Sequence, residues 1–142
     1  RAEGATILYG GEAPAELASS DGNWLLPTIL TDVTNQMCVI QEEIFGPVVT
    51  IQKFSSEAEA IKLANNVSYG LAAAVWTTDS QQALRVSKQI KAGIVWVNTY
   101  NKVYCEMPFG GYKQSGIGRT HGSRAIEFFT EEKTIILKSA TL

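Results

Sequence analysis

The sequence predicts an α/β fold in which parallel strands alternate with helices packed on the sheet. Three apolar stretches, at residues 48–54, 71–77 and 94–98, have the length and composition of strands. The two segments between them carry apolar residues at helical spacing. Strand, helix, strand, helix, strand with short links is typical of parallel strands with helices packed on the sheet.

Composition narrows the class of protein. The chain has 142 residues, 45% of them hydrophobic and 18% charged, which suits one soluble domain with a sizeable core. A net charge of −2 gives no reason to expect nucleic acid or an anionic membrane surface as partner. No apolar run approaches the roughly 20 residues that span a bilayer. The start at Arg1 shows no signal-peptide pattern, so we expect a cytoplasmic protein, with any targeting segment upstream.

Metal-ligating side chains are scarce. The only cysteines are Cys38 and Cys105, and the chain has a single histidine. Two distant cysteines form neither a zinc cluster nor a disulfide framework, so we expect no metal site and two free thiols. Cys38 is expected to be packed, whereas Cys105 falls on a loop where it can line a site.

The first third of the chain predicts short, interrupted elements. Residues 5–9 form a candidate strand that two glycines close, and residues 12–22 have the composition of a surface loop. The apolar run 24–30 contains Pro27, which favours an edge strand or two short pieces.

Capping residues define the two helices. Ser56 followed three residues later by Glu59 is a capping-box pattern at the start of the first helix. Asp79 or Ser80 can begin the second, and Gly93 suits its C-terminal stop.

The last third predicts a loop, a short helix and a terminal strand. The loop 99–108 follows the third strand, and ligands of open parallel sheets bind outside the carboxyl ends of strands. A short helix is expected at about 123–129. The apolar run 133–138 has no partner strand in this chain and would be an aggregation edge if left exposed.

The stretch 41–48 carries the clearest chemical pattern. Glu43 and Phe45 are two residues apart, so an extended chain would point both side chains the same way. A carboxylate accepts hydrogen bonds from vicinal hydroxyls, and a phenyl ring packs on a flat heterocycle. Gly46 would allow a turn, and Pro47 would fix the exit. The alternative is a strand entrance with solvated acids and one core phenylalanine.

This stretch resembles a signature of the aldehyde dehydrogenase superfamily, and so do three others in matching order and spacing. They lie at 42–48, 65–71, 94–98 and 108–119. The resemblance covers nearly the whole chain but only the C-terminal part of such an enzyme. It implies that residues 1–119 belong to the catalytic domain and that 120–142 form a crossing helix and an oligomerisation strand.

The resemblance implies an enzyme that oxidises an aldehyde to a carboxylic acid with NAD or NADP through a cysteine thioester. The family's nucleophilic cysteine follows a Gly-Gln pair, which precedes neither Cys38 nor Cys105. We therefore expect the nucleophile and the glutamate base upstream, no catalytic residue here, and no activity from this chain alone. A non-catalytic α/β module that binds a dinucleotide, or one that serves assembly, is the alternative.

Five residues acquire site roles from the same resemblance. Glu43 would hold the hydroxyls of the nicotinamide ribose, and Phe45 would pack near the nicotinamide ring. Asn101, Val103 and Phe109 fall where the family lines its aldehyde tunnel, although Phe109 also suits a simple core position.

Residues 106–113 look like those of betaine-aldehyde-type members. Tyr100 and Tyr104 add aromatic character, and aromatic walls suit quaternary-ammonium aldehydes through cation–π contact. Gly116 and Gly118 also resemble the start of a phosphate-binding fingerprint, but its third glycine would stand where the chain has His121.

The end of the chain resembles the family's subunit interface. Arg119 resembles an arginine that pairs near that interface, here with Glu131, and an ordinary surface pair worth under about 1 kcal/mol is the alternative. Many members carry a relay glutamate where this chain has Thr120. Either His121 substitutes for it or water activation rests on the upstream glutamate. The strand at 134–137 would pair with a neighbouring subunit in a dimer or tetramer.

Overall fold

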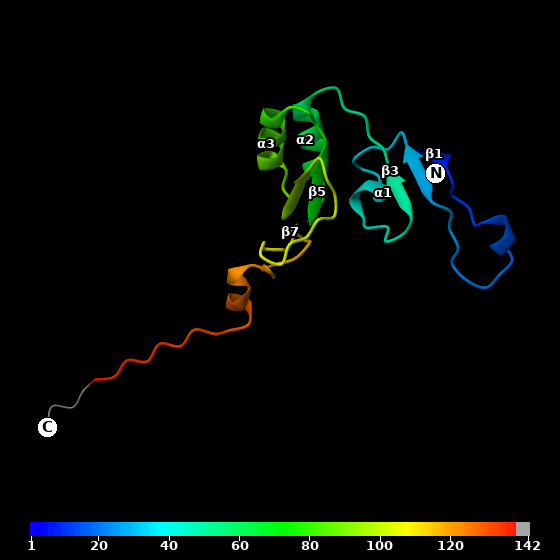
Figure 1. The fold of residues 1–142 in the computed structure, drawn as a ribbon. Coiled ribbons are helices and arrows are strands. Elements are labelled where there is room, and N and C mark those ends of the chain that lie inside the picture. Colours follow the sequence, from blue (N-terminus) through cyan, green and yellow to red (C-terminus); the bar gives the residue numbers. More distant parts are fainter. Residues whose placement is uncertain (139–142) are drawn as a thin grey trace. The chain divides into compact units, whose positions relative to one another are not determined.

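The computed structural model describes residues 1–138, which fall into two compact units, Arg1–Ser68 and the part from Tyr69 onward (Figure 1). The secondary structure of the first unit is β1 (Thr6–Tyr9), a 3-10 turn (Ala15–Leu17), β2 (Thr28–Thr31), α1 (Cys38–Gln41), β3 (Val48–Thr50) and α2 (Glu57–Asn65). That of the second is β4 (Tyr69–Gly70), β5 (Ala72–Val75), α3 (Ser80–Gln89), β6 (Ile94–Val97), β7 (Tyr112–Lys113) and a 3-10 helix (Ser123–Phe128).

The first unit is built on a three-stranded sheet in the order β1-β2-β3. Strand β1 runs antiparallel to β2, with Thr6 opposite Thr31, whereas β2 and β3 are parallel, with Thr28 opposite Val48. Helix α2 begins as the sequence predicts, since the Ser56 side chain accepts a hydrogen bond from the Glu59 N–H at 3.2 Å. The Glu59 carboxylate accepts from the Ser55 N–H and hydroxyl, and these bonds lower the pKa of Glu59.

The second unit is built on the parallel pair β5–β6, with Ala72 opposite Ile94, and α3 packs on both strands (Figure 1). Asp79 caps α3, because its carboxylate accepts from the N–H groups of Gln81 and Gln82 at 2.8 and 3.2 Å. Strand β4 pairs with β7 in a separate antiparallel ribbon.

Three expectations about these elements were wrong in detail. The predicted strand at 24–30 forms only from Thr28, because the backbone before it bonds a loop, with the Leu26 N–H donating to the Glu12 carbonyl. The strand predicted at 48–54 ends at Thr50. The parallel pairs β2–β3 and β5–β6 also lie in different sheets rather than in one. The short helix expected at about 123–129 does form, as a 3-10 helix at residues 123–128.

Gly93 is not the stop of α3. The helix ends at Gln89, and the capping residue Ile90 has φ and ψ of −71° and 127°, which are extended rather than left-handed. Gly93 instead lets two backbone segments touch, because a Cβ there would overlap the Gly110 carbonyl group, whose carbon would lie 2.8 Å away. The glycine thus serves a backbone crossing rather than a helix cap.

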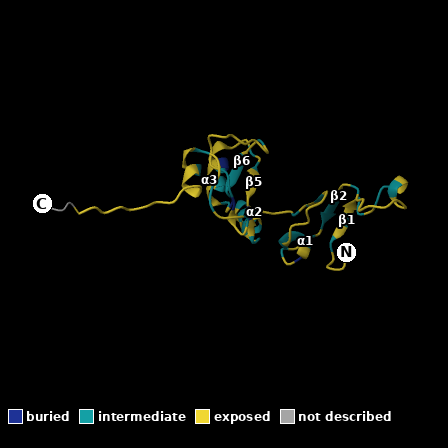
Figure 2. Ribbon diagram, turned by 90° about the horizontal axis from the view of Figure 1, so that it is seen from below, coloured by how far each residue is buried: buried dark blue, intermediate teal, exposed yellow. Residues whose placement is uncertain are grey.

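Buried side chains are few in the described part of the chain. The apolar ones are Met37, Ala83 and Ala92, and most of the ribbon is half-buried or exposed (Figure 2). Residues 130–138 form neither helix nor strand, and Ile135, Ile136 and Leu137 are 77%, 91% and 87% exposed. The predicted strand at 133–138 has no partner strand here, and residues 139–142 of the predicted interface segment lie outside the described residues.

We expect Gly93→Ala to lower the free energy of unfolding by about 2–3 kcal/mol, because the added methyl forces apart two backbone segments. Gly46→Ala is the matched control, since its Cβ would meet only Ile44 atoms at 3.9 Å. Denaturant unfolding of the two variants measures the difference. Equal midpoints would contradict the backbone contact.

Candidate functional site

The stretch 42–47 forms an exposed turn between α1 and β3. Phe45 has a φ of +50°, in the left-handed region that a bulky residue rarely adopts. The expectation that an extended chain aligns the side chains of Glu43 and Phe45 is therefore wrong. The turn occurs at Phe45 rather than at Gly46, although a glycine would adopt this conformation at lower cost.

Glu43 and Phe45 remain available to a ligand. Phe45 is 93% exposed, and Glu43 is exposed as well. Within residues 1–138 neither side chain makes a hydrogen bond, ion pair or ring contact. The exit of the turn is held by the backbone, where the Thr28 N–H donates to the Pro47 carbonyl at 2.8 Å. The turn is thus anchored at its end while its acid and its ring are uncommitted.

The second candidate region is the loop after β6, and Asn98 holds its beginning. Asn98 has a φ of +52°, and its side chain bonds the backbone of Thr77 twice. The amide oxygen accepts from the Thr77 N–H at 2.9 Å, and the amide nitrogen donates to the Thr77 carbonyl at 2.8 Å. The sequence did not predict these two hydrogen bonds of Asn98. The one available signal was an asparagine at a strand end, since asparagine tolerates left-handed backbone.

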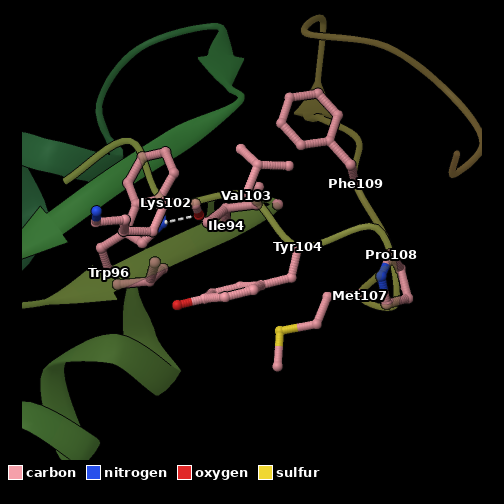
Figure 3. Close-up of a pocket in the computed structure, with 10 residues that line it drawn as sticks. Ile94, Trp96, Lys102, Val103, Tyr104, Met107, Pro108 and Phe109 are labelled. Carbon is pink, nitrogen blue, oxygen red and sulfur yellow. Dashed lines mark hydrogen bonds between the residues drawn. The ribbon is translucent and has the colours of Figure 1, made fainter. Parts of the chain in front are cut away.

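Trp96 folds the same loop back onto β6. Its indole N–H donates to the Lys102 carbonyl at 2.8 Å (Figure 3). Its ring also meets the Tyr100 ring edge to face, with centroids 5.2 Å apart. Residues 98–102 are therefore fixed by Asn98 at one end and by Trp96 at the other.

The fixed loop and β6 enclose a cavity of about 480 Å³. Its apolar lining includes Ile94, Trp96, Val103, Tyr104, Met107 and Phe109 (Figure 3). Of the three residues predicted to line an aldehyde tunnel, Val103 and Phe109 line this cavity. Asn101 is exposed at a φ of +55° and is not among the lining residues.

Phe109 is tied to the segment that follows the glycine-rich turn. It forms a β-bridge with Thr120, with N–H to carbonyl distances of 2.7 and 2.8 Å in the two directions. The Thr120 hydroxyl donates to the Phe109 carbonyl at 3.3 Å, so this hydroxyl is committed to the backbone. The His121 ring lies 5.9 Å from the Phe109 ring at a tilt of 48°.

Arg119 stabilises the glycine-rich turn. Its guanidinium donates to the carbonyls of Gly111 and Gly118 at 3.0 and 2.6 Å and lies over the Tyr112 ring at 5.4 Å. In the described part of the chain it forms no ion pair with Glu131, so the predicted pairing stays a prediction about a subunit interface. Gly116 and Gly118 adopt φ values of +130° and +79° and lead into the β-bridge rather than into the helix that a phosphate-binding fingerprint requires.

Both thiols are free and exposed, which corrects the expectation that Cys38 is packed. Cys38 begins α1, where its N–H donates to the Glu3 carboxylate at 2.9 Å. A hydrogen bond to Glu3, and then the charges of Glu3 and Glu42, raise the pKa of the Cys38 thiol above its ordinary value. Because the thiolate is the reactive form, Cys38 is a poor nucleophile.

We expect Glu3→Gln to speed alkylation of Cys38 by iodoacetamide at pH 7.5. Removing the Glu3 charge lowers the thiol pKa toward its ordinary value, so more thiolate is present at that pH. Mass spectrometry of the Cys38 peptide over time measures the rate. Glu42→Gln should act more weakly because Glu42 contributes less to the shift. An unchanged rate in Glu3→Gln would refute the electrostatic account.

Residues 1–138 offer neither a metal site nor a membrane-spanning helix. No group of three His, Cys, Asp or Glu side chains there could hold a metal ion. In the same residues, no helix combines the length and the apolar character that a membrane crossing requires.

Comparison with known proteins identifies the family. Residues 1–135 match the profile of the aldehyde dehydrogenase family. The chain is 54% identical over 132 residues to an aldehyde dehydrogenase of Emericella nidulans, covering 93% of this chain and 26% of that protein. It is 48% identical over 138 residues to the betaine aldehyde dehydrogenase of Brucella anthropi, covering 97% and 28%.

A solved structure agrees with the sequence relatives. The betaine aldehyde dehydrogenase of Staphylococcus aureus, crystallised with NAD+, superimposes with a TM-score of 0.85 at 47% identity, covering 90% of this chain and 25% of that one. The chain thus spans about a quarter of the length of the relatives it matches. It belongs to the aldehyde dehydrogenase family.

Proposed function

We propose that this chain is the C-terminal part of an NAD- or NADP-dependent aldehyde dehydrogenase, which oxidises an aldehyde to a carboxylic acid through a cysteine thioester. Residues 1–119 belong to the catalytic domain, and 120–142 form a crossing helix and an oligomerisation strand. The observation that carries the proposal is the exposed, uncommitted pair Glu43 and Phe45 within a family signature.

Glu43 and Phe45, in the first unit, are the proposed cofactor contacts. The ionised Glu43 carboxylate accepts hydrogen bonds from the two hydroxyls of the nicotinamide ribose, and such charge-assisted bonds are strong. The exposed Phe45 ring packs near the nicotinamide, and the bound cofactor supplies the hydride acceptor. The left-handed backbone at Phe45 supports this assignment, because strained residues cluster at ligand-binding positions.

Val103, Phe109 and Asn101, in the second unit, are the proposed aldehyde contacts. Val103 and Phe109 line a preformed apolar cavity of about 480 Å³, a size in the range of small-molecule sites. Asn101 stands on the same loop, where its amide can reach a polar group of the substrate. The proposed chemistry would take a nucleophilic cysteine and a glutamate base from outside this chain, because no Gly-Gln pair precedes Cys38 or Cys105.

We further propose a quaternary-ammonium aldehyde as the substrate class. Trp96, Tyr100 and Tyr104 give the loop an aromatic character, and aromatic faces attract such cations. The similarity to proteins named betaine aldehyde dehydrogenase supports the same class.

Self-association is proposed for the end of the chain. The exposed apolar side chains of Ile135 to Leu137 have no partner in the described residues, and a neighbouring subunit would cover them in a dimer or tetramer. Arg119 and Glu131 would lie near that interface. The assembled enzyme is proposed to work in the cytoplasm.

A second candidate is a non-catalytic α/β module that binds a dinucleotide or serves assembly. It is favoured by one observation, namely that neither Cys38 nor Cys105 follows the Gly-Gln pair of the family's nucleophile. The two candidates differ in whether the complete protein produces NADH or NADPH from an aldehyde.

We expect the complete protein to reduce NAD or NADP with an aldehyde, and Glu43→Gln to raise the KM for the cofactor by about tenfold or more, because a bond to a charged acceptor contributes about 1.5–3 kcal/mol. Absorbance at 340 nm follows the reaction. Glu42→Gln is the matched control, since Glu42 is the acid next to Glu43 and is assigned no cofactor contact. An active Glu43→Gln variant with an unchanged KM for the cofactor would reject the ribose assignment. A wild-type protein that oxidises no tested aldehyde would reject the enzymatic function in favour of the binding module.

We expect deletion of residues 133–142 to lower the oligomeric state, because it removes the apolar strand that a neighbouring subunit covers. Sedimentation velocity measures the change. The control replaces only Lys133 and Lys138 with Gln, which leaves the apolar side chains in place. An unchanged sedimentation profile after the deletion would refute the interface.

A further inference from the structure

The contact between His121 and Phe109 has no role in the proposed chemistry as described so far. We propose that His121 is a positioning residue that holds the Phe109 ring against the aldehyde cavity and so sets the affinity for the aldehyde. The inference rests on the proposed function, since it assigns Phe109 to the aldehyde wall.

The backbone brings the two rings together at a fixed register. The bridge between Phe109 and Thr120 places residue 121 one step beyond the paired position. In a regular strand, residues 120 and 121 would point to opposite faces, so His121 would face away from Phe109. His121 instead has a φ of +59°, and this left-handed turn brings its ring to the side of Phe109.

A second tie holds the turn in place. The Gly122 N–H donates to the Cys105 carbonyl at 2.9 Å, so the segments 105–109 and 120–122 are joined on both sides of His121. Gly122 has a φ of +67°, and a Cβ there would come within 3.2 Å of the Glu106 carbonyl oxygen and 3.3 Å of Pro108 Cδ. His121 is therefore confined between two anchored positions.

Phe109 is the side chain through which His121 can act. Phe109 lines both the 480 Å³ cavity beside β6 and a second hollow of about 320 Å³ over the glycine-rich turn, whereas His121 lines neither. A ring between two hollows has space to turn on either side. The His121 ring is the aromatic partner of Phe109 in the described residues, with centroids 5.9 Å apart, and such a contact favours one ring orientation.

The predicted effect is on substrate binding rather than on the chemical step. Losing the ring contact lets Phe109 sample orientations that intrude on the cavity or leave it open, which weakens aldehyde binding. The cofactor side at Glu43 and the upstream nucleophile are not changed. A weaker affinity for the aldehyde with an unchanged chemical step and unchanged cofactor binding separates a positioning role from a general loss of folded protein.

The test uses the complete enzyme with His121→Asn, because asparagine keeps the left-handed backbone and removes the ring. We expect the KM for the aldehyde to rise by about fivefold, with kcat and the KM for the cofactor changed less than about twofold. Asp32→Asn is the matched control, since Asp32 also has a positive φ, of +54°, and lies outside the proposed site. It should leave all three constants unchanged.

Two further variants keep the result specific to the ring pair. His121→Phe retains a ring and should return the KM for the aldehyde to within about twofold of wild type. In a Phe109→Leu background, His121→Asn should have no further effect, because the partner ring is already absent. An active enzyme in which His121→Asn leaves the aldehyde KM unchanged, or acts equally in the Phe109→Leu background, overturns this inference alone. A wild-type enzyme with no aldehyde oxidation overturns the proposed function as well.

Discussion

Close packing of backbone against backbone is the constraint on which the second unit depends. Gly93, at the entrance of β6, lies against the Gly110 carbonyl, and Gly110 in turn lies against the Gly118 carbonyl, 2.6 Å from where a Cβ would stand. Side chains at these positions would push the glycine-rich turn away from the strand. With the glycines, the turn stays close, Arg119 bonds its carbonyls, and the bridge from Phe109 to Thr120 can form.

This packing also determines where the proposed aldehyde wall stands. Phe109 immediately precedes Gly110, so its backbone position follows from the same contact that fixes the turn. From the other side, Asn98 and Trp96 hold the loop through backbone groups of Thr77 and Lys102. The cavity is therefore bordered by a loop that side chains hold through hydrogen bonds to backbone groups, which favours a preorganised cavity wall.

Features that depend on neighbouring residues were predictable from the sequence, whereas features that depend on contacts between distant residues were not. Ser56 was identified as a helix cap, and Asp79 as one of two candidates beside Ser80, because capping depends on a few neighbouring residues. The strand at 48–54 was predicted too long, since its end depends on pairing with β2. Gly93 was misassigned because glycine serves both helix ends and backbone crossings. The left-handed Phe45 could not be foreseen, since its own propensity opposes it and a glycine stands next to it. Resemblance to a family supplied the candidate site, which residue types alone left open.

Two hydrogen bonds join the Asn98 side chain to the Thr77 backbone, so the position of the loop depends on one intact side-chain amide. Hydrolysis of that amide to a carboxylate, the common ageing reaction of asparagine, would replace its donor with a second oxygen facing the Thr77 carbonyl. Two acceptors would then oppose each other where a strand exit is now held. Loss of a single side-chain nitrogen would thus remove one of the two hydrogen bonds that hold the start of this loop.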